Sequence, residues 1–204
     1  MTLRILAAKT ASIAALLAVA APAFAGEGMW TFDAFPIAKV NAALGTKIDQ
    51  AWLDRLRNAA VRIPGCSASL VSPDGLVLTN NHCVIGCAQD LSTPERDYVK
   101  NGFLPATRAE ERQCPGATAE ILTEISDVTA RVKQAAADKT GQAFTQARDA
   151  EMAAIEKEAC SADKSTRCQV VNLYRGGQFK LYRYKRYTDV RLAFSPEHAA
   201  ASFG

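Results

Sequence analysis

The chain has 204 residues, of which 24 are basic and 21 acidic, so its formal net charge at pH 7 is +3. This near balance argues against a protein that binds nucleic acid or attaches to a membrane surface through bulk charge. Local motifs must therefore indicate the class of protein.

Residues 1–25 have the pattern of a signal peptide. Arg4 and Lys9 make the start basic, residues 11–21 form an apolar run, and the Ala-Phe-Ala ending at Ala25 matches a small-x-small cleavage site. The run is too short for a transmembrane anchor. We expect cleavage after Ala25 and an exported chain, periplasmic or secreted, from a Gram-negative bacterium. Its net charge would be about +1, without nucleic-acid or membrane partners.

The start of the mature chain is predicted to be an extended lead-in followed by one helix. Residues 26–47 show no clear hydrophobic period. Residues 48–62 carry apolar side chains at helical spacing, including Leu53 and Leu56, and Asp49 is a suitable N-cap. That apolar face is expected to contact the core.

A β-hairpin is predicted within residues 65–83, which read GCSASLVSPDGLVLTNNHC. Residues 66–71 indicate a half-buried strand, Ser-Pro-Asp-Gly indicates a turn, and residues 76–78 form the return strand. The polar residues that follow predict a chain leaving the sheet at an exposed edge. This arrangement delivers His82 beside Cys83.

The number of cysteines is even, which indicates disulfides in an exported chain. Because the hairpin is flanked by Cys66 and Cys83, a disulfide between them is sterically plausible. We further predict Cys160–Cys168 and, by elimination, Cys87–Cys114. The alternative is a zinc site of His82, Cys83 and Cys87, which the export signal and the lack of a Cys-x-x-Cys pair disfavour.

The middle of the chain combines a charged connection with a helical segment. A helix is expected to start at Thr93-Pro94 and to stop at Asn101-Gly102, and the charged run 108–112 is expected to be a solvated face. A substrate-guiding loop is the less favoured interpretation of that run. Residues 118–129 read as a strand, and residues 130–159 as two helices in an antiparallel arm.

The last part of the chain is predicted to be β. Residues 169–174, 178–187 and 189–194 alternate or nearly so, and a Gly-Gly pair before the second run indicates a hairpin. The second run mixes tyrosines with cations. We interpret it as an ordinary antiparallel strand in preference to a nucleic-acid patch.

These residues carry a resemblance to a known family. The glycine-cysteine strand, the hairpin and the Thr-x-x-His-Cys end resemble the histidine-bearing stretch of chymotrypsin-like serine peptidases. Within that clan, SPDGLVLTNNHC resembles the bacterial dipeptidyl-peptidase 7 and 11 family, whose typical form is Thr-Asn-His-His-Cys. Asn81 stands where the family has the first histidine, and His82 matches the second, which acts as the base.

The resemblance implies a mainly β fold with a helical insertion at about residues 130–159. Residues 26–204 would be the N-terminal barrel of a chymotrypsin-like double β-barrel, truncated before the catalytic aspartate and serine. The end, from Thr188 to Glu197, resembles the strand before a segment that binds the substrate's free amine. The full-length enzyme would release dipeptides from the N-termini of oligopeptides without a cofactor or metal, and a homodimer is a further expectation.

Within this chain the expected catalytic residue is His82, the general base. Ser67 and Ser69 lie in the wrong strand for a nucleophile, His198 lacks a comparable context, and the family match disfavours Asp127 as the orienting acid. The 204-residue chain by itself is therefore expected to be inactive. The alternative from another class is a secreted, non-catalytic binding module that keeps the trypsin-like histidine segment as a relic.

Overall fold

The computed structural model describes residues 29–202, and it divides the chain into two compact units, Met1–Pro36 and Ile37–Gly204. The predicted signal peptide lies outside the described residues. In the first unit, the rings of Trp30 and Phe35 meet edge to face, with centroids 6.1 Å apart. The second unit contains every helix and strand described below.

The second unit opens with two helices, α2 (Ile37–Leu44) and α3 (Gln50–Ala59). The prediction of an extended lead-in through residue 47 is therefore wrong for α2. The Asn41 side chain joins the two helices, because it donates to the Ile48 carbonyl at 2.8 Å and accepts from the Ile48 amide at 2.9 Å. As predicted, Asp49 caps α3, since its carboxylate accepts from the Trp52 amide at 2.7 Å.

Helix α3 ends earlier than expected, and strand β1 (Ala60–Ile63) follows at once. The prediction that this helix continues to residue 62 is therefore wrong. Both neighbours in the sheet pair with β1: Val61 lies opposite Ala68 on one side and opposite Ile121 on the other. β-branched residues such as Val61 suit a pleated sheet. Pairing with both neighbouring strands therefore makes residues 60–63 a strand and not a continuation of the helix.

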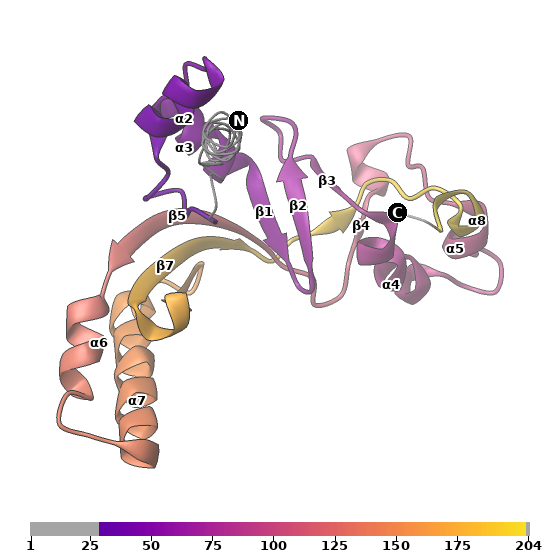
Figure 1. Cartoon of the computed structure of the whole chain (residues 1–204). Coiled ribbons are helices and arrows are strands. Elements are labelled where there is room, and N and C mark those ends of the chain that lie inside the picture. The colour runs from indigo at the N-terminus through magenta and orange to yellow at the C-terminus, as the bar shows by residue number, and fades with distance from the viewer. Residues whose placement is uncertain (1–28, 203–204) are drawn as a thin grey trace, which may run out of the picture. The chain divides into compact units, whose positions relative to one another are not determined.

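A six-stranded antiparallel sheet forms the main body, in the order β3-β2-β1-β5-β7-β6 (Figure 1). The predicted hairpins are confirmed, including the one at residues 65–83. The residues that the structure describes show this sheet open, with β3 and β6 at its edges, so what is confirmed is an antiparallel β fold with helices. The remaining strands are β2 (Cys66–Leu70), β3 (Val77–Thr79), β5 (Ala119–Asp127), β6 (Thr166–Leu173) and β7 (Gln178–Tyr187).

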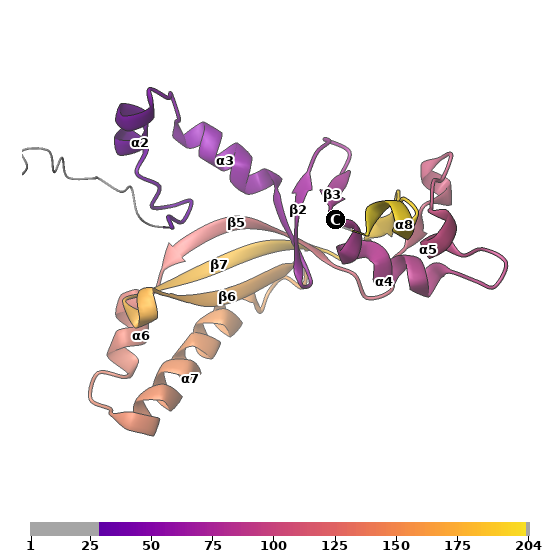
Figure 2. The same cartoon turned by 45° about the vertical axis from the view of Figure 1, so that its right-hand side comes forward.

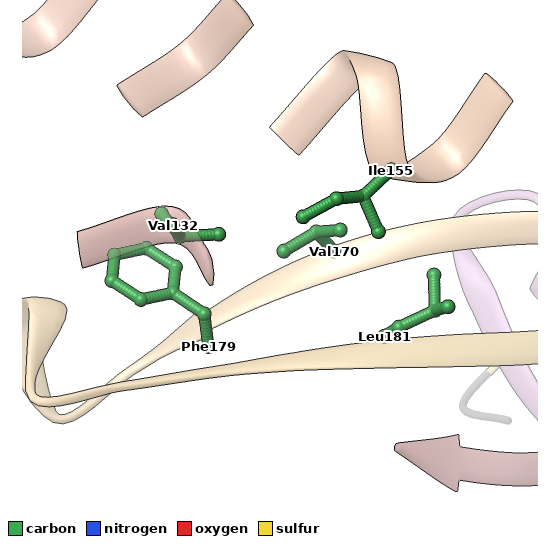
Figure 3. Packing of buried hydrophobic residues seen from close by; sticks show 5 residues of the cluster. All are labelled: Val132, Ile155, Val170, Phe179 and Leu181. Atoms are coloured by element: carbon green, nitrogen blue, oxygen red, sulfur yellow. The ribbon is translucent and has the colours of Figure 1, made fainter. Parts of the chain in front are cut away.

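The two helices expected in residues 130–159 are present as α6 (Thr129–Ala135) and α7 (Gly141–Cys160), which lie antiparallel to one another (Figures 1 and 2). Both cover one face of β6 and β7. Figure 3 shows the side chains of the two helices meeting those of the two strands in a buried apolar cluster. Its members are Val132, Ile155, Val170, Phe179 and Leu181.

A second apolar cluster gathers Ala88, Phe103, Cys114 and Leu192. Short elements surround it, and α4 contacts both α5 and α8 (Figures 1 and 2). The elements are α4 (Asn81–Leu91), α5 (Tyr98–Asn101), a 3₁₀ turn (Arg108–Glu110), β4 (Arg112–Gln113), β8 (Arg191–Leu192) and α8 (His198–Ala201).

Two expectations about these short elements are wrong. Thr93 and Arg96 form an isolated bridge, and the helix begins only after Asp97, whose carboxylate caps it. The strand expected at residues 189–194 is reduced to β8, which pairs with β4. Short elements of this kind depend on the cluster that they cover, so a local sequence pattern does not place their ends. The charged run 108–112 is largely exposed, as predicted.

One carboxylate is buried in the main sheet among arginines. Glu120 is only 6% exposed and lies 3.0 Å from Arg167 Nη1 and 3.1 Å from Arg186 Nε. On β7, the strand of Arg186, the side chain of Arg183 lies 3.8 Å from Glu124. Pairing of the cations in β7 within the sheet supports the interpretation of residues 178–187 as an ordinary strand. Among the described residues, no helix is long and apolar enough to cross a membrane.

The loop closed by Cys160 and Cys168 provides a prediction about pH. Hydrogen bonds from Ser165 and Thr166 lower the pKa of Asp163 from 3.8 to about 2. A lowered pKa in the folded state adds stability above the unfolded value, and this stability is lost as pH falls through the folded value. Wild type should therefore have a larger free energy of unfolding than Asp163→Asn at pH 4, and the difference between the two chains should shrink as pH falls to 2. Denaturant titrations of both chains across this range measure it, and Ser165→Ala should weaken the same pH dependence.

Candidate active site

His82 lies in the first turn of α4, which starts two residues after β3 ends. The chain leaves the sheet at the edge strand β3, as predicted, and continues directly into this helix. Val84, Ala88 and Leu91 face the second apolar cluster. Their spacing of four and three residues is typical of a helix, so the sequence contains a signal for α4 that the predictions did not use.

A disulfide between Cys66 and Cys83 ties this first turn to the start of β2, with the two Cα atoms 6.1 Å apart. The pairs Cys87–Cys114 and Cys160–Cys168 are present too, so all three predicted disulfides are confirmed. Because Cys83 and Cys87 are both oxidised, neither offers the thiolate that the zinc interpretation requires. Residue 82 is thus held on a short, cross-linked turn.

The His82 side chain is exposed and lines an open hollow of about 600 Å³. A ring nitrogen of His82 lies within 4.8 Å of both sulfurs of the neighbouring disulfide. An exposed imidazole on a fixed support can exchange a proton with a group that enters the hollow. The hollow is lined by Arg62, Ile63, Gly65, Cys66, Ser67, Asn80, His82 and Cys83.

Asp127 is engaged at the end of β5, away from the stretch of β5 that pairs with β1. Its carboxylate accepts from the Thr129 amide at 2.8 Å and lies 3.0 Å from Lys180 Nζ. Hydrogen bonds from Thr129 and Lys180 hold the pKa of Asp127 well below its usual range. These contacts give Asp127 a structural role, in agreement with its rejection as the orienting acid.

The structure places the other candidates in different surroundings. Ser67 lines the hollow with His82, and its carbonyl accepts from the Thr79 hydroxyl at 2.9 Å. Ser69 is exposed on β2, opposite Leu78 of β3. His198 lies in α8 and meets Asn81, the residue before His82, with 3.4 Å between Asn81 Nδ2 and His198 Nδ1. No sequence pattern predicts this contact, because 117 residues separate the two side chains.

A histidine on a turn anchored by a disulfide and open to a hollow has the access that a general acid or base requires. Comparison with known proteins identifies the family to which the chain belongs. The Peptidase S46 family model matches residues 25–204, and the chain belongs to this family.

Curated relatives and solved structures agree with this assignment. The chain is 27% identical to dipeptidyl-peptidase 7 of Porphyromonas gingivalis, over 94% of this chain and 28% of the relative. It is 33% identical to the Asp/Glu-specific dipeptidyl-peptidase of Porphyromonas endodontalis, over 89% of this chain and 27% of the relative. The crystal structure of Porphyromonas endodontalis DPP11 in complex with substrate superposes with a TM-score of 0.72 at 29% identity, over 85% of this chain and 27% of that one. The chain thus spans about a quarter of the length of these relatives.

Proposed function

We propose that the complete protein containing this chain is a serine-type dipeptidyl aminopeptidase, which releases dipeptides from the N-termini of oligopeptides. The observation that carries the proposal is the position of His82: exposed in a hollow, on a turn anchored by the Cys66–Cys83 disulfide, in a chain of the S46 family. The likeness to dipeptidyl-peptidases supports the substrate class.

In this proposal His82 is the general base. Its imidazole takes the proton of a serine hydroxyl as the oxygen attacks the peptide carbonyl, and it returns the proton to the leaving amine. The serine, the orienting aspartate and the oxyanion donors would come from residues beyond Gly204. The disulfide and the hairpin would hold the imidazole at a constant distance from that serine.

The proposed architecture follows the same resemblance. The open sheet with its covering helices would be part of the N-terminal barrel of a chymotrypsin-like double β-barrel, with α6 and α7 as the helical insertion. Residues 1–25 would be a signal peptide that directs the protein to the periplasm or the medium. A homodimer of the full-length enzyme belongs to the same proposal.

A comparison of free and blocked peptides tests the activity. The complete gene product should release dipeptides from oligopeptides with a free amino terminus, and it should leave N-acetylated copies of the same peptides intact. Mass spectrometry of the products over time distinguishes successive dipeptide release from internal cleavage. Cleavage of the acetylated copies would indicate an endopeptidase, and a lack of any cleavage would favour the non-catalytic binding module.

A further inference from the structure

Asn81, the residue directly before His82, has its side chain buried against the end of the chain. It is only 9% exposed, although it starts a helix. Its Nδ2 lies 3.4 Å from both His198 Nδ1 and the Ala201 carbonyl oxygen. Its Oδ1 accepts from the Ser195 hydroxyl at 3.5 Å. One amide therefore connects the first turn of α4 to residues 195–201.

The segment that receives Asn81 is itself firmly held. Ser195 is 1% exposed and exchanges two backbone hydrogen bonds with Phe103, at 2.7 and 2.9 Å. Gly102, with φ of +72°, permits this approach, because a Cβ there would lie 2.9 Å from the Ser195 carbonyl oxygen. In both views α8 lies beside α4 (Figures 1 and 2). Asn81 thus meets a fixed surface.

The first turn of α4 needs such a contact. Asn80 is the N-cap of α4, and its side chain makes no capping hydrogen bond. A helix start without a cap leaves amide groups unsatisfied and frays readily. Two tethers remain on either side of His82: the disulfide of Cys83 to the hairpin, and the amide of Asn81 to residues 195–201.

Burial of an amide side chain is unfavourable unless its hydrogen bonds are made, so an apolar residue would suit a purely structural role at position 81. We propose that Asn81 is a positioning residue, which fixes the orientation of the His82 imidazole by locking the start of α4 to residues 195–201. This inference rests on the proposed role of His82 as the base. Residues 195–201 would therefore support the turn that carries His82.

The variant Asn81→Ala tests the proposal, with Asn172→Ala as the matched control at an exposed position. In the complete gene product we expect Asn81→Ala to lower kcat by about 10- to 100-fold with KM within about twofold, since a small displacement of a catalytic group acts on the chemical step. The control should change neither constant. A rise in KM with unchanged kcat would overturn the proposal.

A second measurement needs no activity and separates this proposal from the proposed function. The 204-residue chain has two histidines, so imidazole NMR signals are assigned with a single His198→Gln variant. Asn81→Ala should shift or broaden the His82 signals, and Asn172→Ala should not. Unchanged His82 signals in a folded Asn81→Ala chain would refute the positioning role, whether or not the gene product is a peptidase.

If Asn81→Ala fails to fold, Ser195→Ala removes the hydroxyl that lies 3.5 Å from Asn81 Oδ1 and 3.3 Å from the Pro196 carbonyl oxygen. A smaller shift of the same His82 signals is then the expected result. Identical His82 signals in Ser195→Ala and wild type would count against the proposal.

Discussion

Replacement of His82 by alanine should lower kcat of the complete gene product by about four to six orders of magnitude, while the fold and the three disulfides persist. Without a base, the serine hydroxyl keeps its proton and attacks poorly, and the leaving amine receives no proton. Residual activity would come from substrate binding and oxyanion donors alone. Because His82 is exposed, the substitution removes no core packing, so the melting temperature should stay close to that of wild type.

Ser69→Ala is the matched control for this experiment. Ser69 is exposed on β2, close in sequence to the disulfide that holds His82, and its substitution should leave kcat and KM unchanged. The measurement is steady-state release of dipeptides from a free N-terminus. Retention of more than about a hundredth of the wild-type kcat in His82→Ala would remove this residue from the reaction.

Removal of the Cys66–Cys83 disulfide should destabilise the chain by about 3 kcal/mol, because this bridge closes a loop of 17 residues in the unfolded state. The double variant Cys66→Ser, Cys83→Ser is the appropriate chain, since it leaves no free thiol to form a wrong pair. Denaturant titration under non-reducing conditions gives the free energy of unfolding. The same variant should also shift the His82 imidazole signals, because the first turn of α4 loses one of its two tethers.

The Cys160–Cys168 bridge is the control within the same chain. It closes a loop of only 8 residues, so its removal should destabilise the chain less. It joins α7 to β6, away from α4, and should therefore leave the His82 signals unchanged. A larger loss of stability from Cys160→Ser, Cys168→Ser than from the first pair would contradict the loop-length argument.

Much of the chain could be predicted from local pattern because the pattern and the tertiary contacts agree. The hairpin of residues 65–83 needs a turn of Ser-Pro-Asp-Gly between apolar runs, and both are explicit in the sequence. The Asp49 carboxylate caps α3 because the backbone amides in the first turn of a helix have no partner within the helix. Thr140-Gly141 lies at the start of α7 and separates it from α6. The even cysteine count indicates disulfides, and the hairpin flanked by Cys66 and Cys83 favours that pair, after which Cys87–Cys114 was predicted by elimination.

Other features depended on partners far away in the chain. The strand that starts at Ala60 is set by its partners in neighbouring strands, where Ala60 lies opposite Ser69, so the helical pattern of α3 could not place its own end. The helix that carries His82 was hidden by the polar residues at its start, although Val84 and Ala88 had the correct spacing. Pairing energies across a sheet and burial against a cluster exceed local propensity in such places.

The sequence by itself determined the hairpin, the helical arm and the Cys66–Cys83 disulfide, because each rests on residue types and spacings within one stretch, and the family resemblance of the hairpin added His82 as the candidate base. Only the tertiary structure decided that Asn81 is buried, since its contacts, Ser195 and His198, lie more than a hundred residues away. It also decided that Glu120 is enclosed by Arg167 and Arg186. The physical reason is shared: desolvation and hydrogen bonding of a polar side chain depend on which distant segments cover it.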